Sequence, residues 1–173
     1  MVERPTNGAR FQRSELTDFD SRDLPKFVEW SESFVPPVDE FNFVRRHVTA
    51  TMAFLLLEIV LPKFIVVRGC VLRETKYEPS NFEHWWSESK GNTQAVESVI
   101  NELHLWDLFD SAPGEYDEGE YLAMEAMAPR IADAWRSIAE VQFADRTFTV
   151  EVGDEYGPTV SLISHERDLG TAT

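Results

Sequence analysis

The sequence predicts an α+β fold in which four or five helices pack on a small, mostly antiparallel sheet of three strands. Apolar residues recur at intervals of three or four in several segments, which is typical of amphipathic helices. A short run rich in β-branched residues near 64–72 predicts one strand, and alternating residues near 147–164 predict a hairpin. Because the strands do not alternate regularly with the helices, a doubly wound sheet is disfavoured.

The length and composition predict a single domain. The chain has 173 residues, 43% of them hydrophobic, and its 12 Phe, 5 Trp and 4 Tyr supply the large rings of one core. We predict a mobile N-terminal arm at 1–22, a compact domain at 23–166 and a tail at 167–173. The arm is separated from the domain because its polar and charged residues follow neither structural period.

The first two helices are predicted at 23–33, with Asp23 as the cap, and at 39–60, with Pro62 marking the end. In the second helix an apolar stripe marks one face, formed by Phe41, Val44, Val48, Met52, Leu55 and Ile59. Three further apolar residues lie off this stripe, namely Phe54, Leu56 and Leu57. We therefore expect the second half of this helix to be buried on nearly all sides.

The run at 64–72 is predicted to form a central strand with both faces covered, and Gly69 inside it allows a bulge or a close contact. Cys70 is the only cysteine, so no disulfide forms within the chain, and we expect Cys70 to be a buried apolar residue. The first ten residues lack the apolar core of a signal peptide, and the apolar stretch at 52–67 is too short and too often interrupted to cross a bilayer. We expect a cytoplasmic protein without a membrane segment.

The next two helices are predicted from their caps. Ser80 and Glu83 form a capping box that opens a short helix ending near Gly91, and Asn92 or Thr93 caps the following one. The apolar stripe of that second helix consists of Val96, Val99, Ile100, Leu103 and Trp106.

Asp107 falls within this stripe, where an unpaired carboxylate is costly. Either Arg68 or Arg73 pairs with Asp107, or the helix ends by Trp106 and Asp107 caps the next segment of the chain. After an acidic linker at 110–119, a long helix is predicted from Glu120 to Phe143, which Pro129 should kink or split.

The charge is negative and unevenly distributed. With 31 acidic and 16 basic side chains the formal charge is −15, which excludes an ordinary nucleic-acid binder because phosphate contacts need a surplus of Lys and Arg. Between residues 77 and 140 there are 14 acidic and only 3 basic side chains. Such a concentration is typical either of a solvated helical surface or of a face that binds a basic protein partner.

Two adjacent tryptophans lie within this acidic segment, Trp85 and Trp86. An aromatic anchor bordered by carboxylates would suit a basic partner, and the alternative is that both rings close the core beneath the first helix. The predicted partner-binding residues are Glu83, Trp85, Trp86, Glu88, Glu102, Asp110, Glu115, Asp117, Glu118 and Glu120.

No catalytic residue, metal site or cofactor is predicted. The candidates for metal ligation are His84 beside Glu83, and His104 three residues before Asp107, and their apolar and aromatic neighbours favour a structural role. Paired cysteines, a His-Glu-x-x-His motif, a P-loop and a nucleophile elbow are all absent from the sequence.

These observations favour a non-enzymatic acidic module that occupies a basic surface of a partner, such as a bacterial or phage immunity or inhibitor protein against a nuclease-like toxin. One alternative is a homo-oligomeric assembly or scaffold subunit in which exposed aromatic and Met residues form the contact. A second alternative is a small-molecule binder or hydrolase with an unfamiliar pocket that uses His84 or His104.

Overall fold

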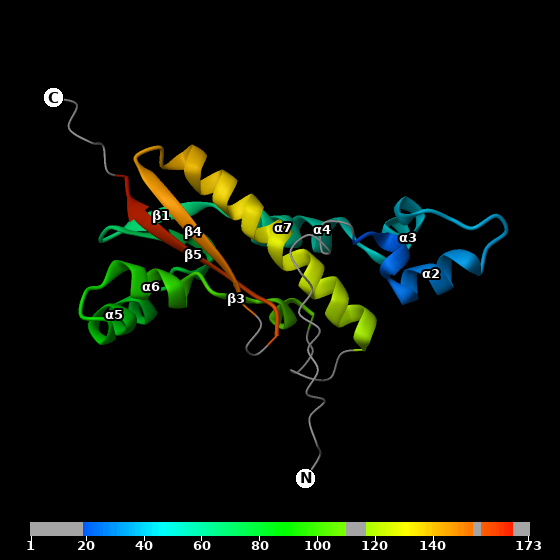
Figure 1. The fold of residues 1–173 in the computed structure, drawn as a ribbon, viewed down its shortest axis with the longest axis horizontal. Helices are drawn as coiled ribbons and strands as arrows, with labels where there is room; N and C mark the ends of the chain where they lie inside the picture. The colour runs from blue at the N-terminus through cyan, green and yellow to red at the C-terminus, as the bar shows by residue number, and fades with distance from the viewer. Residues whose placement is uncertain (1–18, 110–116, 154–156, 168–173) are drawn as a thin grey trace, which may run out of the picture.

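The computed structural model describes residues 19–109, 117–153 and 157–167, and within them it confirms the α+β class. Most of the predicted arm, the end of the predicted tail, and most of the predicted linker, with Asp110 and Glu115, lie outside the described residues. The helices are α2 (Pro25–Glu32), α3 (Glu40–His47), α4 (Ala50–Val60), α5 (Pro79–Glu88), α6 (Thr93–Ile100) and α7 (Glu118–Gln142), with short 3-10 turns η1 (Ser21–Asp23), η2 (Glu74–Lys76) and η3 (Leu105–Leu108) (Figure 1).

The C-terminal hairpin is confirmed. β4 (Arg146–Gly153) and β5 (Thr159–Glu166) pair antiparallel, with Val150 opposite Leu162. β5 also pairs with the two-residue strand β3 (Leu103–His104), so the three-stranded sheet has the order β3-β5-β4. Its third strand is therefore β3 rather than the segment near 64–72.

That segment was predicted as one central strand, and the prediction is wrong because the segment is a hairpin of its own. β1 (Phe64–Val67) pairs antiparallel with β2 (Cys70–Arg73) in a separate two-stranded sheet. The turn lies at Arg68 and Gly69, which have φ angles of 47° and 86°. Two successive positive φ angles are typical of the tight turns that match the twist of a hairpin.

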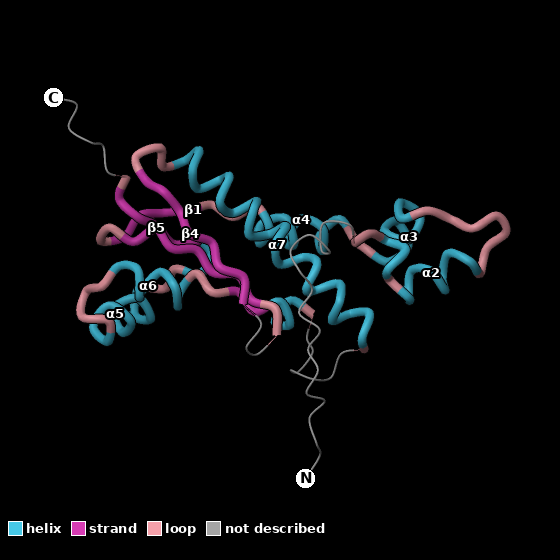
Figure 2. The backbone as a smooth tube through the Cα atoms, viewed as in Figure 1, coloured by secondary structure: helices cyan, strands magenta, loops and turns pink. Residues whose placement is uncertain are grey.

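The two sheets are joined by the polar side chains of Glu97 in α6 and of Asn101, the residue that follows α6. α6 lies against both β2 and β5, and Figure 2 shows it beside β5. Glu97 accepts hydrogen bonds from the Val71 N–H through Oε1 and from the Ser164 N–H through Oε2, each 2.6 Å long. Asn101 donates from Nδ2 to the carbonyl oxygens of Val71 (2.8 Å) and Leu162 (2.9 Å). These two side chains supply the backbone of β2 and β5 with the partners that a neighbouring strand would otherwise provide.

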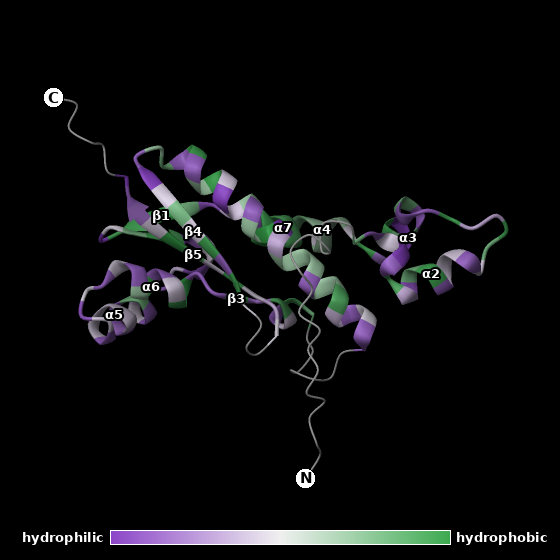
Figure 3. Cartoon of the chain, viewed as in Figure 1, coloured by the Kyte–Doolittle hydropathy of each residue, from purple (hydrophilic) through white to green (hydrophobic). Residues whose placement is uncertain are grey.

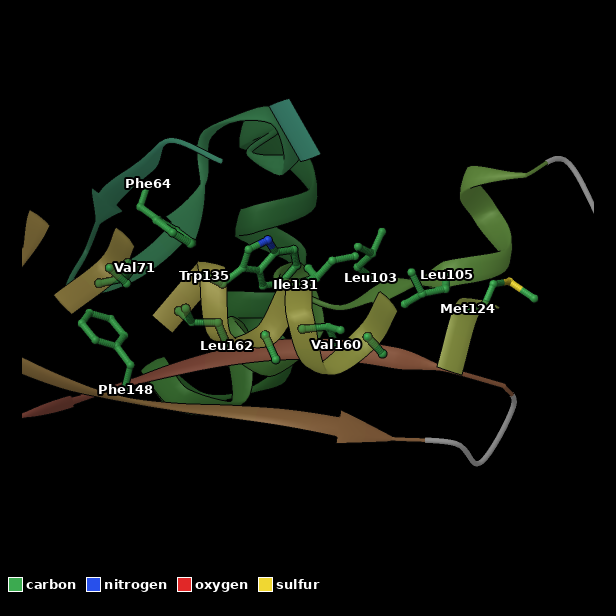
Figure 4. Close-up of a cluster of buried hydrophobic side chains, with 13 residues drawn as sticks. Phe64, Val71, Leu103, Leu105, Met124, Ile131, Trp135, Phe148, Val160 and Leu162 are labelled. Atoms are coloured by element: carbon green, nitrogen blue, oxygen red, sulfur yellow. The ribbon is translucent and has the colours of Figure 1, made fainter. Parts of the chain in front are cut away.

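The main core lies between α7 and the sheet, where Ile131 and Trp135 of α7 pack toward Val160 and Leu162 of β5 (Figure 4). Trp135 is fully buried, and its indole N–H donates to the carbonyl oxygen of Ile59 (3.0 Å). α7 is continuous through Pro129, so the helix is not split there. Burial against the sheet on both sides of the proline offsets the one helical hydrogen bond that its ring removes.

A second core lies between α5, α6 and β2, and it buries Phe82, Val96, Leu72 and Cys70. Cys70 is buried in this core, as predicted, and its burial raises the pKa of the thiol to about 11.

The single helix predicted at 39–60 is two helices, because the chain adopts extended backbone at Val48 and Thr49. The Thr49 hydroxyl accepts a hydrogen bond from the Met52 N–H (3.1 Å) and starts α4 as a new helix. No described residue of α4 is buried, so the expectation that its second half is covered on nearly all sides is wrong for this chain alone.

Two predicted caps are also wrong. Glu78, and not a box of Ser80 and Glu83, caps α5 by accepting hydrogen bonds from two backbone N–H groups, with Pro79 in the first turn. Asp23 belongs to η1, where it forms a capping box with Asp20, while α2 starts at Pro25 with no side-chain cap.

Asn92, one of the two predicted caps, caps α6. α6 ends at Ile100, so the prediction that its stripe continues through Leu103 and Trp106 is wrong, because these residues lie in β3 and η3. Asp107 therefore lies in η3 and is exposed, which agrees with the alternative that the helix ends before it. Neither arginine proposed for it pairs with it, because Arg68 binds Glu83 and Arg73 binds the Glu102 carbonyl.

None of the helices in the described part of the chain combines the length and the apolar character needed to cross a membrane.

Candidate protein-binding surface

The predicted acidic residues do not lie on one continuous face. Glu83 and Glu88 belong to α5, whereas Asp117, Glu118 and Glu120 lie at the start of α7. Figure 1 shows the start of α7 well separated from α5, on the side of the molecule that faces α2 and α3. Glu97 is one of the 14 acidic residues between 77 and 140. It is 0% exposed and accepts hydrogen bonds from the backbone of β2 and β5, so it is not available to a partner.

Several of these carboxylates are paired with the protein's own basic groups. Arg68 binds Glu83 (2.8 Å), and Lys26 of α2 binds Asp117 (2.9 Å) and Glu120. Hydrogen bonds from the ammonium to Glu120 and Asp117 raise the pKa of Lys26 to about 12, and the bond from Lys26 lowers the pKa of Asp117. The charge available to a partner is therefore smaller than the residue count suggests.

Trp85 and Trp86 are partly buried against the second core. The Trp86 ring stacks on Phe82, with 5.7 Å between centroids, and the Arg68 guanidinium lies 5.5 Å from the Trp86 ring. The pair therefore helps to close a core, although this is the core under α5 and not one beneath the first helix.

His84 and His104 lie in different parts of the fold. His84 is exposed on α5, and its ring lies 5.2 Å from Trp85. His104 is in β3, stacks on Trp106 at 4.4 Å, and lies 3.5 Å from Glu102. Among the described residues, no group of three or more His, Cys, Asp or Glu side chains is arranged to hold a metal ion.

Nine exposed large apolar side chains lie on or directly beside α3 and α4, which the sequence interpretation placed in the core. We call them together the α3–α4 surface, which consists of Phe41, Val44, Val48, Met52, Phe54, Leu55, Leu56, Leu57 and Leu61. These side chains are between 38% and 73% exposed. Figure 3 shows the hydrophobic colouring of α4.

α4 is attached to the rest of the protein mainly through its C-terminal end. Ile59 and Val60 pack against the main core, and the Ile59 carbonyl accepts the hydrogen bond from Trp135. All α4 residues before Ile59 are exposed except Ala53 and Glu58, which are partly buried.

α2 and α3 form a small lobe that lies apart from the two sheets (Figure 1). Within it, Phe43 packs edge-to-face on Phe27 (5.5 Å) and on Trp30 (5.1 Å). An open hollow of about 550 Å³ is present on this lobe, lined by Trp30, Phe34, Val38, Asn42, Arg45 and Arg46. Within the described residues, neither of these two arginines has an ion pair.

Comparison of the chain with protein-family models, with curated protein sequences and with solved structures finds no match.

Proposed function

We propose that this is a cytoplasmic, non-enzymatic protein-binding module whose main contact region is the α3–α4 surface. The observation that carries the proposal is the size of that surface. A large apolar side chain has roughly 150–200 Å² of surface, so nine such side chains at the observed exposures present on the order of 800 Å². The largest apolar patch of a typical monomer is about 300–600 Å², and larger ones are typical of binding sites.

The free energy involved is large. At about 25 cal/mol per Å², covering this surface releases on the order of 20 kcal/mol before the costs of association are subtracted. A helix that is apolar on all sides, as α4 is, is stable in water only when another surface covers it.

Site-specific photo-crosslinking in the native host tests this proposal. A benzophenone amino acid replaces Phe41 or Phe54 on the α3–α4 surface, and Val141 on α7 serves as the control because it is apolar and 86% exposed but is not part of that surface. Irradiation should give protein crosslinks from the first two positions and none from the control. Equal or absent crosslinking at all three positions would overturn the proposal.

A second candidate function is favoured by the exposed carboxylates on α5 and at the start of α7. Glu88 and Glu118 are exposed, and in the described part of the chain neither has an ion pair. They support a role as an immunity or inhibitor protein that a basic partner approaches through its electric field. Reversal of both residues to Lys should slow association with such a partner and weaken its salt dependence. Unchanged rates at low and physiological salt would refute this role.

A further inference from the structure

The area of the α3–α4 surface matches one half of a stable protein dimer. A standard interface buries about 800 Å² on each partner, which equals the area of this surface. A two-fold dimer uses the same patch on both copies, so one exposed surface per chain is sufficient. The area therefore does not require a different protein as the partner.

The charge distribution also suits a second copy. Between Val48 and Val60 the only ionisable side chain is Glu58, so the α4 part of the surface is nearly neutral in a chain of charge −15. Repulsion between two copies is therefore weakest where these regions meet. The same net charge disfavours an anionic membrane as the occupant.

α3 carries opposite charges at its two ends. Asp39 and Glu40 lie at its start, and Arg45 and Arg46 lie in its last turn. Two α3 helices that pack antiparallel, as a two-fold axis perpendicular to them requires, bring each end beside the opposite charge of the other copy. Such contacts would supply the two arginines with the partners that they lack within the described residues.

The exposed apolar side chains of α4 need to be covered on more than one side of the helix. Adjacent helical residues point about 100° apart, so the exposed run from Phe54 to Leu57 faces every direction around α4. A flat partner covers only one side of such a helix. A second copy brings its own α4 and also the hollow between its α2 and α3, which is wide enough to receive apolar side chains.

From these observations we propose that the α3–α4 surface binds the same surface of a second copy of this chain and forms a two-fold symmetric homodimer. The two α4 helices lie against each other, and the α2–α3 hollow of each copy receives apolar side chains from α4 of the other. This inference rests on the proposed function and names the partner for the same surface.

Sedimentation equilibrium of the full purified chain tests the homodimer. The wild type should have about twice the chain mass of 19.9 kDa at low micromolar concentration. Leu55→Glu places a charge in the centre of the contact and should raise the dissociation constant by roughly 100-fold or more. The matched control Val141→Glu adds the same charge at an exposed residue outside the α3–α4 surface and should remain dimeric.

A charge-exchange experiment keeps the test decisive if Leu55→Glu does not fold. The variant Arg45→Glu/Arg46→Glu makes both ends of α3 acidic, and Glu40→Arg removes the net negative charge from the start of α3, where Asp39 remains. Each variant alone should dimerise several-fold more weakly than the wild type. An equimolar mixture should form mixed dimers, because the basic end of α3 in the Glu40→Arg copy then meets an acidic end of the other variant.

The outcomes separate this inference from the proposed function. If the wild type is a monomer and its Phe41 position crosslinks to a different protein, the homodimer is refuted and the proposed role of the α3–α4 surface in protein binding is supported. A monomer that gives no crosslinks overturns both. A dimer that Leu55→Glu leaves intact, or binding of the wild type to phosphatidylglycerol vesicles through α4, also overturns the homodimer.

Discussion

The replacement Asn101→Leu should be among the most damaging single substitutions in this protein, although both side chains have the same number of heavy atoms and the same branching. Asn101 is fully buried and serves three backbone groups: it accepts from the Arg73 N–H (3.0 Å) and donates to the carbonyl oxygens of Val71 and Leu162. Leu has a similar shape and can make none of these bonds. Because each buried polar group left without a partner costs about 1–3 kcal/mol, we expect a loss of roughly 3–6 kcal/mol in the free energy of unfolding.

Asn92→Leu on the same helix is the matched control. Asn92 is exposed and caps α6 through one hydrogen bond, from the Ala95 N–H (3.2 Å). Loss of such a cap costs about 1 kcal/mol. Both variants are compared with the wild type by urea unfolding followed by tryptophan fluorescence, at one protein concentration so that association contributes equally. If Asn101→Leu costs no more than Asn92→Leu, the role of Asn101 in joining β2 to β5 is refuted.

Three further substitutions test the polar and aromatic groups in and around the cores. Burial raises the pKa of Glu97, so its contribution to stability is fully present below about pH 4.5 and is lost as pH rises through the folded-state pKa. Urea unfolding of Glu97→Gln against the wild type should therefore show the difference shifting in favour of Gln as the pH rises above about 4.5. Trp86→Ala should lower stability by about 2 kcal/mol in thermal melting without changing the mass of the assembly in sedimentation, because its ring closes the second core. Arg73→Met should change the unfolding free energy by no more than about 1 kcal/mol, because burial lowers the pKa of Arg73 to about 10 and leaves its Nε without a hydrogen bond.

For each of these three predictions, one experimental result would contradict the reasoning. A stability difference between wild type and Glu97→Gln that is the same at all pH values would show that Glu97 is not perturbed by burial. A Trp86→Ala variant that melts like the wild type but loses association would place Trp86 in an interface. A loss of more than about 3 kcal/mol in Arg73→Met would show that the bond to the Glu102 carbonyl and the contact with Trp135, 4.5 Å away, outweigh the cost of the buried charge.

Local patterns predicted the elements whose stability depends on local signals. The alternation at Phe148 and Val150, and again at Val160 and Leu162, identified β4 and β5, because one face of this hairpin lies against α7. Asn92 identified the start of α6 because capping depends on residues within one turn.

The polar residues that join the two sheets were missed because their partners are distant in sequence. Glu97 lies 67 residues from Ser164, and Asn101 lies 61 residues from Leu162. One signal was present in the sequence: Glu97 and Asn101 are four residues apart, directly beside the buried residues Val96 and Ile100. Polar side chains at this spacing on the edge of an apolar stripe can form their hydrogen bonds either with water or with buried backbone groups. Only the tertiary fold decides between these two possibilities.

The α3–α4 surface shows why an apolar stripe can be recognised from sequence while its cover cannot. The spacing of apolar residues along the sequence identifies the side chains that favour burial. It does not indicate whether the surface that covers them belongs to the same molecule. Within the described residues the apolar faces of α6 and α7 are already used, α6 against β2 and α7 against β5. α4 therefore contacts this core only through Ile59 and Val60, and most of its side chains have no opposing face in the described part of the chain. A second copy supplies an uncovered surface of the same size and neutral charge, which is the physical reason to expect that the missing cover is intermolecular.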